Sequence, residues 1–263
     1  MVITACPFAA LPKVLQRLSS FKITALVNAS KGIDQKSLMT FTRMTKKYLK
    51  VPTATLSGPT FAKEVLEKKP TACVLAGESA SFVRDLAKKL STNYFRIYVS
   101  SDPIGVEACG AMKNVLAIAC GISDGLRLGQ NARAALLTRG LIELRSIVEK
   151  LGGRAETVFG LAGVGDLWLT ATGDLSRNRR LGLALAEGLS VKSALKKING
   201  TCEGLYTAKQ IYTLAKNHRM DLPISEQVYS ICFKGKDPKT ALFELMNREL
   251  KSEESSSSKG RRT

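Results

Sequence analysis

Short apolar runs alternate with amphipathic stretches over the first hundred residues. The runs are rich in β-branched side chains, as buried strands are, and they lie at 2–5, 23–28, 53–56, 71–75 and 95–99. Helical periodicity fills some of the intervals between them, at 9–18 and 82–90. Strands interleaved with helices predict a mostly parallel sheet that is covered by helices on both faces.

After about residue 100 the strand-like runs stop and helical spacing continues. Asp102 and Pro103 open a long apolar helix, because proline suits the first helical turn. Further helices are predicted at 131–151, 177–187, 191–198, 205–216, 224–233 and 238–250. The pattern therefore predicts an α/β part over 1–100 and an all-α part over 101–250. Residues 251–263 hold serines and basic residues with little to bury, which predicts a disordered tail.

The composition is that of a folded protein with a basic surface. Hydrophobic residues make up 44% of the chain and charged residues 24%, while 40 lysines and arginines against 22 acids give a net charge of +18. This surplus predicts attraction to anions, which could be small phosphates, nucleic acid or a membrane surface. The most apolar stretch, 104–122, contains Glu107 and Lys113, so we interpret it as a buried helix of a soluble protein rather than a membrane span.

Histidine and cysteine usage argues against a metal site. His218 is the only histidine, which excludes any mechanism that needs a histidine pair. None of the six cysteines forms a C-x-x-C pair, so we predict reduced, buried thiols rather than a zinc site or a disulfide framework. The chain starts directly on a strand and lacks the pattern of a signal peptide, so we expect further sequence upstream.

Lys113 is the residue with the strongest chemical signal. It lies among small and apolar side chains at 110–119, where burial would lower its pKa toward the range that suits proton transfer. Asn114 beside it adds a neutral donor and acceptor. The alternative is a lysine that reaches solvent or forms a structural pair with Glu107.

Two turns that follow predicted strands are candidate anion sites. In the first, Gly58 permits close backbone approach and Thr60 could cap a helix that begins near Ala62. In the second, Lys31 follows the strand at 23–28 and would lie at the carboxyl edge, where open α/β sheets bind ligands. The alternatives are a plain capped connection for the first turn and a solvated lysine for the second.

Two more motifs lie in the helical half. Residues 160–165 have the spacing G-x-x-G-x-G outside any βαβ context, so we reject a dinucleotide fingerprint and expect the glycines to present Asp166 at a fixed place, to pair with Lys113 or hold a substrate hydroxyl. Residues 172–180 open a helix in which a Ser176 cap, Arg177 and Asn178 make a phosphate site. The alternative for this second motif is a solvated basic helix start.

Taken in order, these motifs resemble the NAD(P)-dependent glycerol-3-phosphate dehydrogenases of the bacterial type. The resemblance runs from residue 1 to about 250, and the segments that carry it are 30–33, 57–64, 105–107, 113–114, 121–126, 131–140, 160–166, 172–180 and 203–204. Because many motifs occur in register, a chance similarity is a poor explanation.

The resemblance implies a fold and a reaction. Residues 1–100 would be the C-terminal portion of a dinucleotide-binding Rossmann domain, and 101–250 a helical substrate and catalytic domain like that of 6-phosphogluconate dehydrogenase. The enzymes interconvert sn-glycerol 3-phosphate and dihydroxyacetone phosphate with NAD or NADP, which supplies glycerophospholipid precursors. A cytoplasmic homodimer with no membrane span and no nucleic-acid partner is expected, or an organellar one if a targeting segment lies upstream.

The resemblance also implies roles for individual residues. Lys113 would be the proton acceptor, and no metal takes part. Residues that contact substrate would be Lys31, Gly58, Thr60, Lys113, Asp166, Ser176, Arg177 and Asn178. Residues that contact the cofactor would be Lys31, Ala62, Arg177, Thr201 and Glu203, where Thr201 replaces a more usual valine.

One departure from the family pattern keeps two alternatives open. The glycine-rich G-x-G-x-x-G turn of the family does not occur in this chain, so we expect it, with one or two βαβ units, upstream of residue 1. The first alternative is a truncated, catalytically inactive homologue that binds phosphate. The second is a basic nucleic-acid-binding protein, although no stacking-aromatic motif or known module supports it.

Overall fold

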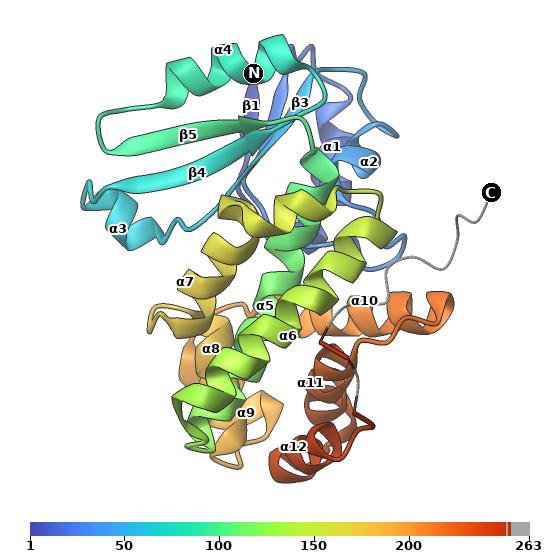
Figure 1. Cartoon of the computed structure of the whole chain (residues 1–263). Coiled ribbons are helices and arrows are strands. Elements are labelled where there is room, and N and C mark those ends of the chain that lie inside the picture. Colours follow the sequence, from blue (N-terminus) through green and yellow to red (C-terminus); the bar gives the residue numbers. More distant parts are fainter. Residues whose placement is uncertain (251, 254–263) are drawn as a thin grey trace, which may run out of the picture.

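The computed structural model describes residues 1–250, 252 and 253, and it places a five-stranded sheet above a group of helices (Figure 1). Apart from 252 and 253, the tail predicted at 251–263 lies outside the described residues. The strands follow one another in the sheet in chain order, as β1 (Val2–Thr4), β2 (Leu26–Asn28), β3 (Thr53–Ser57), β4 (Thr71–Ala76) and β5 (Phe95–Ser100). Each strand overlaps a predicted one.

One pair of strands departs from the parallel arrangement. β1, β2 and β3 pair in parallel, as do β4 and β5, but β3 and β4 are antiparallel. The connection from β3 to β4 contains only the short helix α3 (Ala62–Leu66), so the chain turns back at the same edge of the sheet. The connection from β4 to β5 contains α4 (Ala80–Leu90), which is long enough to cross the sheet and restore the parallel direction.

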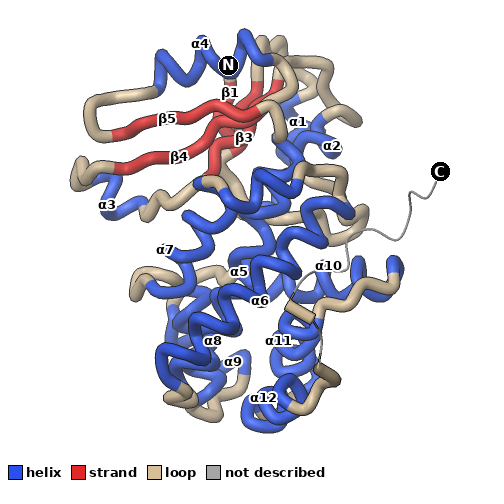
Figure 2. Tube along the Cα trace, in the orientation of Figure 1, coloured by secondary structure: helices blue, strands red, loops and turns tan. Residues whose placement is uncertain are grey.

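Helices cover both faces of the sheet (Figure 2). On one face, α4 packs Val83 and Leu86 against the side chains of β4 and β5. Near β1 and β2, α1 (Leu11–Leu18) and α2 (Phe41–Thr45) bury a separate cluster around Leu15 and Phe41. The predicted helix at 9–18 begins as a 3-10 turn at Phe8–Ala10 before α1.

The long helix α5 (Pro103–Gly125) is the centre of the helical half. Asp102 caps it by accepting a hydrogen bond from the backbone N–H of Gly105 at 2.9 Å. The helices packed against it are α6 (Gly129–Lys150), α7 (Asp166–Thr172), α8 (Arg177–Ala186), α10 (Glu203–His218) and α11 (Pro223–Lys234). By length and composition α5 could cross a membrane, but 94% of its apolar window is buried inside the protein.

The remaining helices differ from the predictions mainly in length. α9 (Val191–Ile198) agrees with its prediction, whereas α12 (Pro238–Met246) ends four residues before the predicted end. Sequence periodicity did not predict α2, α7, the 3-10 turn Ala155–Phe159 or the π-helix Leu161–Gly165. Each of these spans too few turns to show a repeating apolar face.

Glycines set the distance between α5 and α8. A Cβ added to Gly182 would overlap the carbonyl oxygen of Ile118, and one added to Gly121 would overlap that of Arg179. Backbones this close leave no room for a side chain at either glycine. This contact brings the first turn of α8 beside the middle of α5.

A buried carboxyl group joins α6 to α11. Glu143 accepts hydrogen bonds from the backbone N–H groups of Ile224 and Ser225, at 2.6 and 3.1 Å, and from the Ser225 hydroxyl at 2.6 Å. Burial is the main cause that raises the pKa of Glu143 to about 7. The group therefore titrates near neutral pH in the folded protein.

We predict that Glu143→Gln removes part of the pH dependence of stability. The folded protein keeps the Glu143 proton up to about pH 7, whereas the unfolded chain loses it near the ordinary value of 4.5. Protonated Glu143 therefore makes its full contribution to the free energy of unfolding below pH 4.5. This contribution falls by about 3 kcal/mol as the pH rises through 7. Urea unfolding near pH 5 and pH 8 measures the difference between wild type and variant, and an identical pH slope for both would contradict the prediction.

Candidate active site

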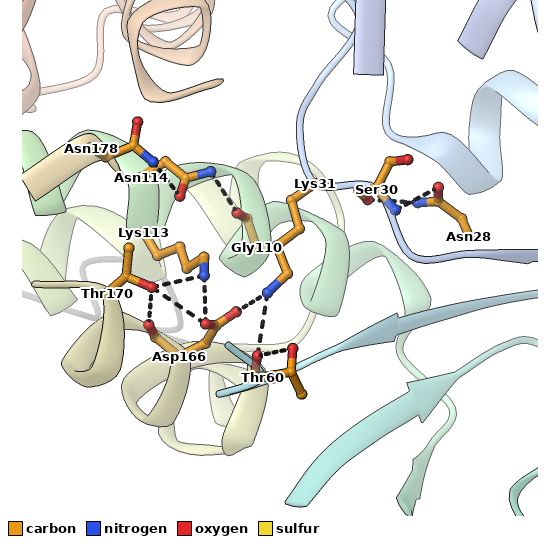
Figure 3. A network of polar contacts seen from close by, with 11 residues as sticks. Asn28, Ser30, Lys31, Thr60, Gly110, Lys113, Asn114, Asp166, Thr170 and Asn178 are labelled. Carbon is orange, nitrogen blue, oxygen red and sulfur yellow. Dashed lines mark hydrogen bonds and ion pairs between the residues drawn. The ribbon is translucent and has the colours of Figure 1, made fainter. Parts of the chain in front are cut away.

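Two lysines share one buried carboxylate where the sheet meets the helices (Figure 3). Lys113, in the middle of α5, donates from Nζ to Asp166 Oδ1 at 2.5 Å and to Thr170 Oγ1 at 2.8 Å. Lys31, just after β2, donates from Nζ to Asp166 Oδ2 at 2.5 Å and to the carbonyl oxygen of Gly58 at 3.2 Å. Residues from four distant parts of the sequence thus meet at one point.

A tight turn of backbone places Asp166. The π-helix Leu161–Gly165 leads directly into α7, of which Asp166 is the first residue. A Cβ on Gly163 would overlap the backbone of Val158, so glycine is needed for the chain to fold back this closely. One turn further along α7, the Thr170 hydroxyl donates to the carbonyl oxygen of Asp166 at 2.6 Å. The glycines at 160–165 therefore do present Asp166 to Lys113.

The surroundings of Lys113 bring the pKa of its amine close to neutral pH. Burial, helped by repulsion from Lys31, lowers the pKa of Lys113 to about 7, and attraction to Asp166 only partly opposes this. Burial alone would raise the pKa of Asp166, but the two lysines outweigh it and the pKa is lowered. Asp166 is therefore a carboxylate near pH 7, where Lys113 changes between amine and ammonium.

Gly110 of α5 faces the stem of Lys31 and the Ser57 hydroxyl. A Cβ on Gly110 would be 3.5 Å from Lys31 Cγ and 3.1 Å from Ser57 Oγ. The turn after β3 also differs from the prediction in one respect. Thr60 does not cap α3, whose N-cap is Phe61 without a side-chain bond; instead its hydroxyl donates to the Gly58 carbonyl oxygen at 3.1 Å. Because that carbonyl also accepts from Lys31, Thr60 lies beside the lysine cluster.

The start of α8 connects to the same cluster through two amides. Ser176 caps α8 as predicted, since its Oγ accepts a hydrogen bond from the backbone N–H of Arg179 at 3.2 Å. Asn178 Nδ2 donates to Asn114 Oδ1 at 2.9 Å, and the backbone N–H of Gly204 donates to Asn178 Oδ1 at 3.0 Å. Asn178 therefore links the first turns of α8 and α10 to the residue next to Lys113.

Arg177 is an exposed cation at this turn. Its side chain is exposed and lies against Gly200, and it forms no ion pair within the described part of the chain. By contrast, Arg179 is held by Asp124 at 2.8 Å. Burial raises the pKa of Glu203, and the positive charge of Arg177 acts against that rise, so the two side chains lie near each other.

Two expected cofactor residues stay outside the network. Ala62 is the first residue of α3 and is exposed, and Thr201 is exposed in the segment before α10. Ala62 has no polar side chain, and over residues 1–250 the Thr201 hydroxyl makes no hydrogen bond. Glu203, the first residue of α10, is half-buried and lies near Arg177 rather than near the two lysines.

A crevice at the carboxyl edge of the parallel strands is too narrow to admit a water molecule. Its floor contains the Ser57 hydroxyl, which is buried and has no hydrogen-bond partner among the described residues. The crevice is lined by Phe8, Ser30, Lys31, Gly32, Thr55, Ser57, Val106, Glu107 and Gly110. In the part of the chain that the structure describes, no group of three or more histidine, cysteine or acidic side chains could hold a metal ion.

Family comparisons agree with this geometry. Models of the N-terminal and C-terminal parts of NAD-dependent glycerol-3-phosphate dehydrogenase match residues 1–83 and 102–243, respectively. The chain belongs to this family. It is 47% identical over 232 residues to glycerol-3-phosphate dehydrogenase (NAD(P)+) of Syntrophobacter fumaroxidans, a match that covers 87% of this chain and 68% of the relative. A Coxiella burnetii relative of the same name is 46% identical over 230 residues, covering 88% and 69%.

Solved structures of the family have the same fold. The crystal structure of Coxiella burnetii glycerol-3-phosphate dehydrogenase superimposes with a TM-score of 0.90 at 44% identity, and covers 94% of this chain and 76% of that one. The Saccharomyces cerevisiae enzyme gives a TM-score of 0.84 at 25% identity, with 94% and 75% covered. The fold class predicted from the sequence, a partial Rossmann-like sheet followed by a helical domain, is therefore confirmed.

Sequence reasoning missed two polar residues of this region. Thr170 carries a detectable signal, since it lies four residues after Asp166 and therefore on the same face of a helix. The other is Glu107, which we considered only as a structural partner of Lys113. In the structure Glu107 instead accepts hydrogen bonds from Thr42 and Thr55.

We predict that Lys31→Met raises the pKa of Lys113 above its present value of about 7. The substitution keeps an apolar stem but removes the positive charge that disfavours the Lys113 ammonium form. It also leaves Asp166 with a single cationic partner. The measurement is the pH dependence of Lys113 acetylation by acetic anhydride, followed by peptide mass spectrometry. Lys36→Met, on the exposed loop after β2, is the control, and an unchanged Lys113 midpoint in Lys31→Met would contradict the prediction.

Proposed function

We propose that this chain interconverts sn-glycerol 3-phosphate and dihydroxyacetone phosphate, with NAD(P) as hydride carrier and Lys113 as the group that exchanges the proton of the C2 oxygen. Membership of the family supports the reaction. The observation that supports the role of Lys113 is its buried amine, which has a pKa near 7 and contacts the Asp166 carboxylate. A general base works best when its pKa lies near the working pH.

Three side chains, those of Lys113, Asp166 and Lys31, transfer the proton and stabilise the charge at substrate C2. In the oxidation direction the Lys113 amine takes the proton of the C2 hydroxyl, and Asp166 stabilises the ammonium group that results. In the reduction direction the ammonium group returns the proton to the carbonyl oxygen. Lys31 adds a second positive charge nearby, which stabilises negative charge that develops on this oxygen. Gly58 and Thr60, beside Lys31, would contact the same end of the substrate.

The substrate phosphate would bind at the start of α8. Backbone N–H groups in the first turn of a helix, together with the helix dipole, attract anions. Arg177 adds an unpaired guanidinium group, and Ser176 and Asn178 flank it on the same turn. Asn178 also bonds Asn114, the neighbour of Lys113 on α5, which supports a phosphate site next to the proposed base.

The residues present fit the nicotinamide end of the cofactor. At the carboxyl edge the Ser57 hydroxyl is buried and has no partner among the described residues, which supports a polar group of the cofactor as its partner. Lys31 and Ala62 would contact the cofactor from the sheet side, and Arg177, Thr201 and Glu203 from the helical side. When bound, NAD(P) would supply the hydride chemistry at substrate C2.

The biological setting is part of the same proposal. Residues 1–100 would serve as a portion of the dinucleotide domain, 101–250 as the substrate domain, and the product would supply glycerophospholipid synthesis. A cytoplasmic location is supported by the six cysteines, all of which are free thiols. A homodimer remains an expectation from the family resemblance.

The direct test is a fluorescence titration of the 263-residue chain with NADH and NADPH, alongside turnover of dihydroxyacetone phosphate. We expect saturable binding of at least one cofactor and turnover that Lys113→Ala lowers by about a factor of 100 or more. Lys113→Ala should still bind cofactor. Cofactor binding without turnover by the wild type would instead support an inactive phosphate-binding homologue.

We predict that Arg177→Ala weakens substrate binding by about 2–4 kcal/mol, since it removes a charged hydrogen-bond donor from a phosphate. The measurement is the KM for glycerol 3-phosphate at saturating cofactor. Arg180→Ala, one turn along α8, is the matched control for the general effect of positive charge. If the control raises KM as much as Arg177→Ala does, Arg177 has no specific role at the phosphate.

A further inference from the structure

One stripe of α5 faces the carboxyl edge of the sheet. Glu107, Gly110 and Asn114 are spaced i, i+3 and i+7, so they share a face of the helix, and Lys113 lies at the end of this stripe. Gly110 contacts the stem of Lys31, and Asn114 contacts Asn178. The site described above involves Gly110, Lys113 and Asn114 of this stripe, but it gives no role to Glu107.

Glu107 binds the sheet side of the molecule through three donors. Its Oε1 accepts from the Thr42 hydroxyl and from the Thr55 hydroxyl, each at 2.6 Å, and the backbone N–H of Thr42 also points to the carboxyl group. Thr42 belongs to α2 and Thr55 to β3. Glu107 is only 4% exposed, and both threonines are buried. A carboxyl group on α5 is thus fixed to two elements of the sheet half.

We propose that Glu107 is a positioning residue for Lys113: it fixes α5 on the sheet at the register in which Gly110 lies under Lys31 and Lys113 meets Asp166. The inference deepens the proposed function, since it takes Lys113 as the reacting base. Glu107 itself does not contact Lys113, Lys31 or Asp166 through any hydrogen bond. It acts through the helix, which is rigid over the six residues, about 9 Å, that separate it from Lys113.

The consequence of losing this anchor follows from the groups that face Lys113. The charged groups are Lys31, which follows β2, and Asp166, at the start of α7; Thr170 of α7 adds a hydroxyl. Asp166 and Thr170 belong to the helical half and would move with α5, whereas Lys31 is attached to the sheet. A shift of α5 relative to β2 therefore separates the two lysines and admits water, and both changes favour the ammonium form of Lys113.

Glu143 provides a matched control within the same chain. Like Glu107, it is 4% exposed and accepts hydrogen bonds from three donors. For Glu143 the donors are one hydroxyl and two backbone N–H groups. Glu143 joins α6 to α11 and forms no hydrogen bond to Lys31, Lys113 or Asp166. Its removal should destabilise the protein about as much as removal of Glu107, without changing the register between α5 and the sheet.

The test compares Glu107→Ala, Glu107→Gln and Glu143→Ala. The readout is the pH midpoint of Lys113 acetylation in the full-length chain without ligands, with thermal unfolding of each variant measured in parallel. This readout needs no turnover, so it remains informative if the proposed reaction is wrong. Glutamine keeps an acceptor oxygen for both threonine hydroxyls, whereas its amide group takes the place of Oε2, to which the Thr42 backbone N–H donates at 3.1 Å.

We expect Glu107→Ala to raise the Lys113 midpoint by about one pH unit or more, and Glu107→Gln to restore it to the wild-type value. Glu143→Ala should lower the unfolding temperature and leave the midpoint unchanged. If Glu107→Ala does not fold, Thr55→Val removes a single donor of the same anchor and should shift the midpoint in the same direction. An unchanged midpoint in folded Glu107→Ala or Thr55→Val, or an equal shift in Glu143→Ala, would overturn the proposal.

Discussion

A single buried carboxylate placed between two lysines is the interaction on which the rest of this structure depends. Burial and, after it, repulsion from Lys31 lower the pKa of Lys113, and the one carboxylate shared by the two lysines only partly opposes this. The same arrangement would be unstable without partners for every charge, because isolated buried charges are costly. The site therefore needs α5, the start of α7 and the end of β2 in fixed positions.

Close packing against α5 supplies those positions. Glycines at 121 and 182 bring α8 against the helix, and Gly204 lets the start of α10 approach Asn114 and Asn178. At these glycines the backbones of α5 and its neighbours lie in direct contact, with no side chain between them. The proposed phosphate turn on α8 and the proposed base on α5 consequently lie together, although 63 residues of sequence separate Lys113 from Ser176.

The sequence predicts the strands and helices that depend on local pattern, but it does not predict features that depend on contacts between distant parts of the chain. The strands and the long helices follow from apolar periodicity, and Lys113 is noticeable because a lysine is unusual among small apolar residues. The antiparallel pairing of β3 and β4, the short helix α7 and the bonds of Glu107 to Thr42 and Thr55 have no local signal. Thr60 illustrates the limit: threonine after Gly-Pro suggests a cap, but its hydroxyl bonds the turn that holds Lys31 instead.

The central claim is that a neutral Lys113 amine is the reacting base near pH 7. The most direct measurement is the pH dependence of kcat/KM for glycerol 3-phosphate oxidation by the wild-type chain at saturating cofactor. The rate should rise with pH through a midpoint near 7, since the free enzyme must lose the Lys113 proton before it can accept one from the substrate. A midpoint near the ordinary lysine value of 10.5, or a rate independent of pH between about 6 and 9, would contradict the account.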